Sequence, residues 1–177
     1  MTKILFVCHG NICRSPMAEF VMKDLVRKAG RESDFLIESA ATSREEIGND
    51  IHYGTRSKLS QVGVPVERRA ARQIRREDYE RYDYLIAMDD ENLYYMNRCW
   101  NNDPSGKIKM LLSFAGKNRD IAEHERECKQ DCNKKSFFHL KRYPPPNIRA
   151  AAARPAKIQP IKSFFVEIGS SPAILPV

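Results

Sequence analysis

The fold of this chain is decided by a stretch near its amino terminus, Ile4-Leu5-Phe6-Val7-Cys8-His9-Gly10-Asn11-Ile12-Cys13-Arg14-Ser15-Pro16. Its first four residues form a continuous apolar run, which is typical of a strand buried on both faces of a parallel sheet. Ser15 and Pro16 have the residue types of a helix N-cap and a first helical position, and Glu19 would then lie in the first turn. The stretch therefore predicts a strand, a loop and a helix in succession, with the helix closed by Gly30.

The loop between this strand and this helix has the composition of an anion-binding site. Cys8 and Arg14 stand six positions apart, with Gly10 between them. Backbone N–H groups at a helix start can surround a phosphate, and they favour the thiolate form of Cys8, which is the nucleophilic form. The planar guanidinium of Arg14 can bind two phosphoryl oxygens. We expect Gly10 to supply a backbone angle that other residues resist.

A cysteine and an arginine at this spacing are a common coincidence, but the strand before them and the Ser-Pro helix start after them are not. With these features the sequence resembles the low-molecular-weight protein tyrosine phosphatase family, whose loop text is present from Gly10 to Ser15. The resemblance implies an α/β fold, a three-layer sandwich with a mainly parallel twisted sheet and an N-terminal phosphate-binding loop. It also implies a hydrolase that removes phosphate from phosphotyrosine through a cysteinyl-phosphate, with no cofactor and no metal.

The resemblance implies a role for each loop residue. Cys8 would be the nucleophile, and Arg14 would bind the phosphate and stabilise charge in the transition state. Ser15 would hydrogen-bond the cysteine sulfur, and Asn11 would hold the loop in its strained shape. Cys13 matches a second cysteine that forms a reversible disulfide with the nucleophile under oxidants. Its alternative interpretation is a small apolar loop residue.

Three further features bear on the substrate. Ile12 presents an apolar wall that suits an aromatic ring, whereas the related protein-arginine phosphatases have threonine at this loop position. Residues 41–49 follow a second predicted strand, Phe35 to Ala40, at the edge where parallel sheets bind ligands. The resemblance implies that they form one wall of the substrate cleft. Tyr53 is either another wall residue or a packed aromatic at a helix start. The expected partners are phosphotyrosine proteins or small aryl phosphates, without nucleic acid and without membrane insertion.

An arginine-rich segment follows a predicted helix over residues 54–62; it contains Arg68, Arg69, Arg72, Arg75 and Arg76. A solvated basic face is the default interpretation, because no aromatic residues or nucleic-acid-binding module accompany the charges. The resemblance places a histidine near Arg69 in many family members, where it braces the phosphate loop through the asparagine. That bracing is left open here because the histidine is absent.

Two more strands are predicted, over residues 84–88 and 107–112. The first ends at Asp89, whose expected task is to cap the following helix. The pair Asp103-Pro104 precedes the second strand and is predicted to be a turn. The alternative is that it matches the Asp-Pro pair of the family, in which the aspartate protonates the leaving phenolate.

The resemblance ends after Ala122, where relatives carry Asp-Pro and two aromatic residues and this chain continues Glu123-His124-Glu125. Residues 123–177 hold seven of the ten prolines, and ten Lys or Arg against five Asp or Glu. We therefore predict a phosphatase domain over residues 1–122 that lacks its usual C-terminal part. Residues 123–177 are predicted to be a divergent tail, disordered or derived from an altered reading frame or exon. Asp120, Glu123 and Glu125 are the candidates to replace the missing acid.

Other functional classes remain open. Without its acid the domain would act as a phosphotyrosine-binding module, or, with Cys128 and Cys132 as a redox pair, as a thioredoxin-coupled arsenate reductase. A zinc site at His124, Cys128, Cys132 and His139 has loosely acceptable spacing. Five cysteines, one of them reactive, fit a reducing compartment, so a cytoplasmic location is expected. No apolar run is long enough to cross a membrane, and no targeting pattern precedes the first strand.

Overall fold

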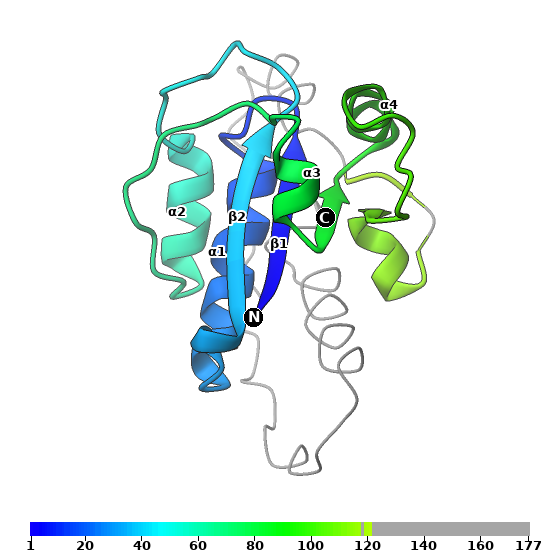
Figure 1. Ribbon diagram of the computed structural model, residues 1–177. Helices are drawn as coiled ribbons and strands as arrows, with labels where there is room; N and C mark the ends of the chain where they lie inside the picture. The colour runs from blue at the N-terminus through cyan, green and yellow to red at the C-terminus, as the bar shows by residue number, and fades with distance from the viewer. Residues whose placement is uncertain (118, 122–177) are drawn as a thin grey trace.

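The computed structural model describes residues 1–117 and 119–121, and a four-stranded parallel sheet forms their centre. The strands are β1 (Thr2–Cys8), β2 (Phe35–Ala41), β3 (Tyr84–Ala87) and β4 (Ile108–Met110), in the order β2-β1-β3-β4. All three strand pairs are parallel, so the carboxyl ends meet at one edge, the upper edge in Figure 1. The loop that follows β1 lies at this edge.

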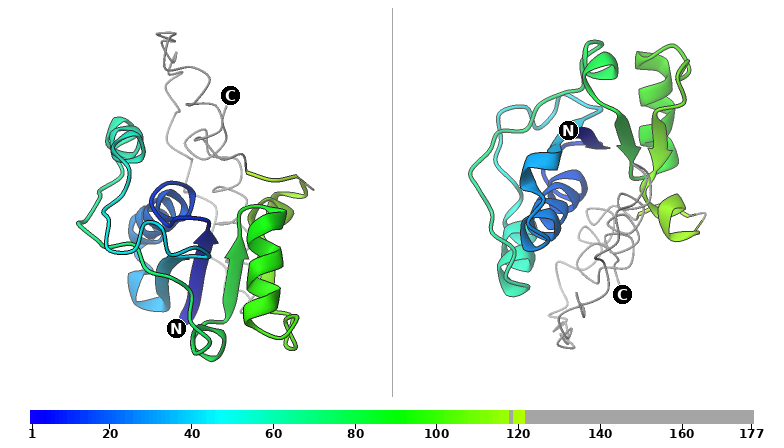
Figure 2. Two further views of the ribbon diagram at one scale, coloured as in Figure 1. Left: turned by 90° about the horizontal axis from the view of Figure 1, so that it is seen from above. Right: turned by 60° about the horizontal axis from the view of Figure 1, so that its bottom comes forward.

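Helices cover both faces of the sheet, as Figure 2 shows. The helices α1 (Arg14–Lys28) and α2 (Tyr53–Gln61) lie on one side, and α3 (Asp78–Arg81) and α4 (Asp90–Cys99) on the other. Along β1, Ile4 and Phe6 enter the core beneath α1, whereas Leu5 and Val7 enter the core beneath α4. All four side chains are fully buried. The predicted three-layer α/β sandwich is confirmed, and the predicted apolar strand is its central strand.

Two predicted elements differ in extent. The strand expected over residues 107–112 ends at Met110, because Leu111 and Leu112 begin the 3-10 helix η2 (Leu111–Ala115). Both leucines are buried, and an unbroken apolar run does not by itself distinguish a strand from a buried helical turn. The helix expected over residues 54–62 is observed as α2, which begins and ends one residue earlier. A second short 3-10 helix, η1 (Glu32–Asp34), precedes β2.

The start of α1 corrects the sequence prediction. The helix begins at Arg14 with Cys13 as its N-cap residue, and no side chain caps it. Ser15 is not the cap, because its hydroxyl is hydrogen-bonded to side chains of the preceding loop instead of to the helix backbone. Pro16 is the third helical residue, where a missing N–H costs nothing because first-turn amides have no partner within the helix. Glu19 consequently lies beyond the first turn. The predicted closure is confirmed, since Gly30 follows α1 with φ of +65°.

The Asp103-Pro104 pair forms a turn before β4, as predicted. Asp103 has φ of 56°, in the left-handed region that aspartate tolerates. Its carboxylate accepts hydrogen bonds from the Tyr79 hydroxyl at 2.8 Å and from the N–H groups of Lys107 and Ile108 at 2.8 and 3.0 Å. The turn lies at the amino end of β4, the sheet edge opposite the loop after β1. This geometry favours the turn over the catalytic alternative.

We expect Asp103→Ala to lower the free energy of unfolding by about 3 kcal/mol, because three hydrogen bonds to a carboxylate are lost at once. Asp103→Asn is the matched control, since it keeps one oxygen acceptor and the tolerance for left-handed backbone. It should lose about half as much. Urea denaturation checks both values, and an alanine variant as stable as the asparagine variant would contradict this account.

Candidate active site

The loop after β1 is held by Asn11, which is fully buried and has φ of 58°. Asparagine adopts this left-handed conformation more readily than most residues. Gly10 corrects the sequence prediction, because it is not among the residues with positive φ. A Cβ at Gly10 would lie 3.1 Å from Cγ of Glu46, which is closer than most Cβ contacts. The strained backbone predicted for Gly10 therefore belongs to its neighbour.

The carboxamide of Asn11 uses its full hydrogen-bonding capacity. Its Nδ2 donates to Oγ of Ser15 at 2.9 Å and to Oγ of Ser39 at 2.8 Å. Its Oδ1 accepts from Nη2 of Arg69 at 2.6 Å and from the N–H of Arg72 at 3.2 Å. Two donors and two acceptor positions are all that an asparagine side chain has. The loop is thus tied to α1, to β2 and to the arginine-rich segment through one side chain.

The sulfur of Cys8 lies against two hydrogen-bonding groups of this loop. It accepts from the N–H of Asn11 at 3.3 Å and lies 3.0 Å from Oγ of Ser15. Ser15 already accepts from Asn11, so its own proton points to the Cys8 sulfur or to the Ala40 carbonyl. The carbonyl is farther away, at 3.5 Å, which favours donation to the sulfur. This arrangement suits a sulfur that carries negative charge.

Arg14 is buried and anchored at the same sheet edge. Its Nη1 donates to the carboxylate of Asp89 and to the carbonyl of Ile121, the latter at 3.2 Å. Asp89 also accepts from the N–H of Asn92 at 2.6 Å, which confirms its predicted task as the N-cap of α4. The sequence analysis did not foresee the contact with Arg14. Asp89 therefore fixes the guanidinium and the helix with one carboxylate.

The segment after β2 runs beside the loop, where a cleft wall was predicted. The N–H groups of Thr42 and Ser43 donate to the carbonyls of Cys8 and His9, at 2.8 and 3.0 Å. Farther along the segment, Glu45 lies 3.3 Å from the imidazole of His9. The segment returns to the loop before α2, where the N–H of residue 52 donates to the carbonyl of residue 12 at 2.9 Å. Its backbone thus follows the loop at both ends.

Tyr53, the first residue of α2, is 77% exposed. Its ring lies 4.4 Å from the ring of His52, centroid to centroid. The interpretation as a packed aromatic is therefore wrong, although the helix start is confirmed. The alternative as a wall residue stays a prediction.

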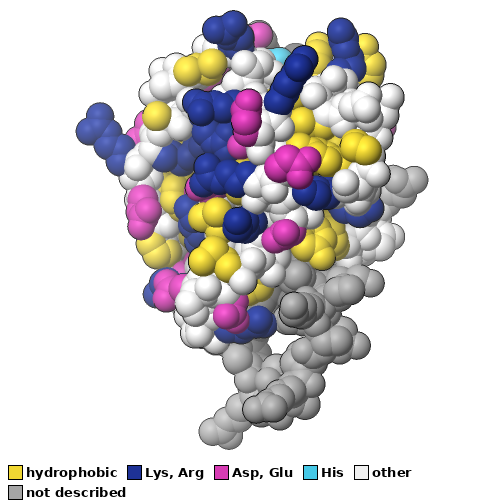
Figure 3. Space-filling view, in the orientation of Figure 1, with side chains coloured by type: hydrophobic (Ala, Val, Ile, Leu, Met, Phe, Trp, Pro, Cys, Tyr) yellow, Lys and Arg dark blue, Asp and Glu magenta, His cyan; other side chains and the backbone are white. Residues whose placement is uncertain are grey.

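The prediction of a solvated basic face is wrong for two residues of the arginine-rich segment. Figure 3 shows Lys and Arg side chains gathered over β2 and the adjoining loop, with acidic side chains among them. Arg75 and Arg76 are exposed, but Arg69 and Arg72 are half-buried. Arg69 donates to both the carbonyl and the carboxamide of Asn11, at 2.9 and 2.6 Å. Arg69 thus stands where the family histidine was expected, and the bracing that the sequence left open is present.

Behind Arg69 lies a buried carboxylate that the sequence analysis assigned only to a helix turn. The carboxylate of Glu19 is 3.8 Å from Nε of Arg69, and it accepts from Ser39 and from Lys23, each at 2.5 Å. Burial lowers the pKa of Arg69, and the Glu19 carboxylate opposes that shift. Ser39 donates to Glu19 and accepts from Asn11, so a chain of hydrogen bonds joins Glu19 to the loop.

The sequence of this chain matches a known enzyme family. A family profile described as low molecular weight phosphotyrosine protein phosphatase matches residues 3–136. The chain belongs to this family. The predicted family, the α/β fold and the hydrolase class are therefore confirmed.

Curated phosphatases and solved structures agree with this assignment. The chain is 39% identical over 123 residues to the low molecular weight protein-tyrosine-phosphatase YfkJ of Bacillus subtilis, covering 70% of this chain and 78% of that protein. It is 43% identical over 122 residues to the human low molecular weight phosphotyrosine protein phosphatase, covering 68% and 77%.

Among solved structures, the crystal structure of YfkJ has a TM-score of 0.69 at 36% identity, covering 72% of this chain and 81% of YfkJ. A crystal structure of a protein tyrosine phosphatase from Entamoeba histolytica, with Hepes in its active site, has a TM-score of 0.65 at 30% identity. That match covers 70% and 80% of the two chains.

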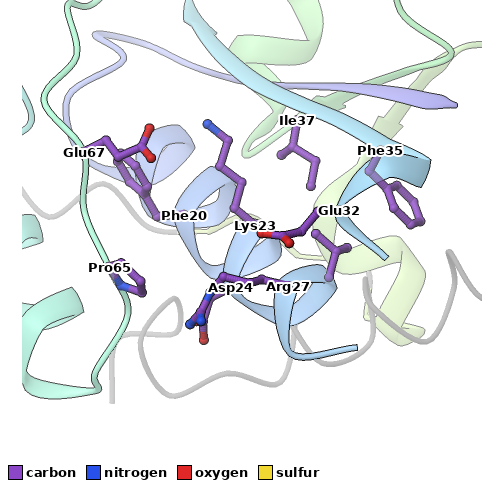
Figure 4. Close-up of a pocket in the computed structure, with 10 residues that line it drawn as sticks. Phe20, Lys23, Asp24, Arg27, Glu32, Phe35, Ile37, Pro65 and Glu67 are labelled. Carbon is purple, nitrogen blue, oxygen red and sulfur yellow. The ribbon is translucent and has the colours of Figure 1, made fainter. Parts of the chain in front are cut away.

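A separate pocket of about 270 Å³ lies away from the phosphatase loop (Figure 4). Its lining includes Phe35 and Ile37 from the first half of β2, whereas the loop adjoins the far end of that strand. Two of its cations are already paired, Lys23 with Glu19 and Arg27 with Asp24. The pocket therefore lies between α1, the first half of β2 and residues 65–67, and not at the phosphatase site.

Some predictions fall on residues outside the described part. The zinc ligands and redox pair proposed between His124 and His139, the acids Glu123 and Glu125, and the whole of residues 123–177 lie there. Among residues 1–117 and 119–121, no cluster of three or more His, Cys, Asp or Glu side chains is arranged to hold a metal. In the same residues, none of the helices is both long and apolar enough to span a membrane.

We expect Asn11→Ala to lower the free energy of unfolding by about 4 kcal/mol, because four hydrogen bonds are lost and alanine resists the left-handed backbone. Asn11→Gly should lower the free energy of unfolding by about 1 kcal/mol less than Asn11→Ala. Glycine loses the same hydrogen bonds but adopts the left-handed backbone without strain. Asn101, which is exposed and has φ of 49°, is the matched control. Asn101→Ala should lower the free energy of unfolding only by the strain of alanine in a left-handed backbone. Equal losses in urea denaturation for Asn11→Ala and Asn101→Ala would contradict the central position of the Asn11 carboxamide.

Proposed function

We propose that this phosphatase transfers the phosphoryl group of an aryl phosphate to Sγ of Cys8 and then to water. The observation that carries the proposal is the environment of that sulfur, which accepts from the N–H of Asn11 and lies 3.0 Å from the Ser15 hydroxyl. Both groups donate to a thiolate, so both stabilise the nucleophile before attack and the departing sulfur afterwards. Gly10, Ile12 and Cys13 complete the loop around it.

In the first step, the Cys8 thiolate attacks phosphorus, the bond between phosphorus and the aryl oxygen breaks, and the phenolate takes up a proton. In the second step, water attacks phosphorus, its proton passes to the carboxylate of the group that protonated the phenolate, and the bond between phosphorus and sulfur breaks. This releases inorganic phosphate and restores the Cys8 thiolate. Arg14 stabilises the charge on the phosphoryl oxygens in both steps, and its anchoring by Asp89 holds it ready for this task.

Phosphotyrosine is the proposed substrate class. The relatives are named phosphotyrosine or tyrosine phosphatases, and Ile12 offers an apolar wall for an aromatic ring. The segment after β2, with its backbone bonded to the loop, would form a second wall. Because the reaction requires a thiolate at Cys8, we place the enzyme in a reducing compartment, in agreement with a cytoplasmic location.

Asp120 is the proposed proton donor for the leaving phenolate. It adjoins Ile121, whose carbonyl accepts from Arg14 and whose N–H donates to the carbonyl of Met88 at 2.9 Å. Asp120 therefore lies at the sheet edge that carries the loop. Partial loss of hydration raises its pKa, and the negative charges of Asp90 and Asp89 raise it further. A raised pKa keeps a carboxyl protonated to higher pH, as a general acid requires.

Turnover is tested with p-nitrophenyl phosphate and a phosphotyrosine peptide. We expect hydrolysis of both, and a loss of at least about 10³-fold in kcat/KM for Cys8→Ser, because the serine hydroxyl is a far weaker nucleophile. Thermal stabilisation by phosphate shows whether the variant is folded. Peptide binding without Cys8-dependent hydrolysis of either substrate would instead support the phosphotyrosine-binding module.

The role of Asp120 is tested through the leaving group. Asp120→Asn should lower kcat/KM for phenyl phosphate by about 10²-fold or more and change that for p-nitrophenyl phosphate much less, because nitrophenolate leaves without a proton. The loss of rate at high pH with phenyl phosphate should also disappear in this variant. Glu91→Gln, on the exposed side of α4, is the control. Equal effects of Asp120→Asn on the two substrates would exclude Asp120 as the acid.

A further inference from the structure

Arg69 donates two hydrogen bonds to the strained part of the phosphate loop. Its Nη1 donates to the backbone carbonyl of Asn11 at 2.9 Å and its Nη2 to the side-chain Oδ1 of the same residue at 2.6 Å. The planar fork of one guanidinium thus binds backbone and side chain together. Because Asn11 has φ of 58°, these two contacts act on the one residue whose backbone conformation the loop has to enforce.

The surroundings of Arg69 favour a fixed positive charge at this place. Glu19 approaches from α1 at 3.8 Å, and its carboxylate is buried. The charges of Cys8, at the end of β1, and of Asp50, in the segment after β2, also favour the charged guanidinium. Arg72 is the one opposing cation among these neighbours. A buried carboxylate and the sulfur of Cys8 therefore both favour a permanent positive charge at Arg69.

We propose that Arg69 is a positioning residue that holds the loop in its phosphate-binding form by a bidentate contact whose charge does not change with pH. The proposal rests on the phosphatase function, because the loop it positions is the one that binds phosphate. An arginine remains charged throughout the working range of the enzyme, whereas an imidazole loses its charge near neutral pH. The brace consequently works equally well on both sides of pH 7.

Three substitutions separate the parts of this proposal. Arg69→Gln removes the charge and the fork, Arg69→Lys keeps the charge but not the fork, and Arg69→His makes the charge depend on pH. Arg68→Gln is the matched control, because Arg68 is adjacent in the chain and exposed. Two quantities are measured between about pH 5.5 and 8: the Kd for inorganic phosphate, by calorimetry, and kcat/KM for p-nitrophenyl phosphate. Each is expressed as the ratio of the wild-type value to the variant value at the same pH.

We expect Arg69→Gln to weaken phosphate binding about 10-fold or more and to lower kcat/KM at every pH, with Arg69→Lys recovering part of both. Arg69→His should approach wild-type activity at low pH, and the ratio of wild-type to variant activity should rise as pH passes about 6.5, where imidazole loses its proton. Arg68→Gln should leave both readouts within about twofold of the wild type.

Two results would overturn the proposal: phosphate binding in folded Arg69→Gln equal to that in Arg68→Gln, or an activity ratio for Arg69→His that does not vary with pH. Circular dichroism identifies variants that fail to fold, and the lysine and histidine variants then decide. If the wild-type protein binds phosphate but does not turn over aryl phosphates, the proposed function fails. The calorimetric comparison still tests Arg69 in that case.

Discussion

The carboxamide of Asn11 is the constraint on which the site depends. It is buried, it has a left-handed backbone, and each of its four hydrogen-bonding positions is occupied by a different residue. If this buried amide lost one partner, its desolvation would no longer be offset by a hydrogen bond, and the folded state would be less stable. The loop therefore has one conformation in which all these groups are satisfied, and that conformation presents the N–H of Asn11 to the sulfur of Cys8. Rigidity of this kind is what a phosphate-binding loop needs, because its donors have to be in place before the anion arrives.

Two ion pairs flank this loop and stabilise it from opposite sides. Arg69 and Glu19 lie behind it, between the arginine-rich segment and α1, while Arg14 and Asp89 lie at its other end, between α1 and α4. In each pair both partners are largely buried, so the loss of one partner would remove a nearby opposite charge from a buried group. The pairs also differ in their tasks. Arg14 is the residue proposed to bind the phosphate, whereas Arg69 contacts the loop through Asn11.

The parallel sheet explains why these distant groups meet. The carboxyl ends of β1, β2 and β3 lie at one edge. Each strand is followed there by a part of the site: β1 by the loop, β2 by the segment from Thr42 to His52, and β3 by Asp89, the N-cap of α4. The central position of β1 places its loop between the other two. Because both faces of β1 are buried under helices, the strand offers the loop a fixed starting point.

The sequence by itself determined the parts that depend on local pattern. The apolar run Ile4 to Val7, followed by a loop and a helix start, predicted a buried strand, and Asp89 before a helix had the residue type of a cap. The loop text from Gly10 to Ser15 identified the family. The start of α1 was misplaced because Ser15 has the residue type of a cap, but its hydroxyl is used by Cys8 and Asn11 instead.

Only the tertiary structure decided which side chains support that loop. Arg69 is separated from Asn11 by 58 positions and stands in a run of arginines that look alike in the sequence. Ser39 and Glu19 carry no motif at all. Their partners are chosen by the folded arrangement of α1, β2 and the arginine-rich segment, because a long-range hydrogen bond depends on where two backbones meet and not on the residues adjacent to either one.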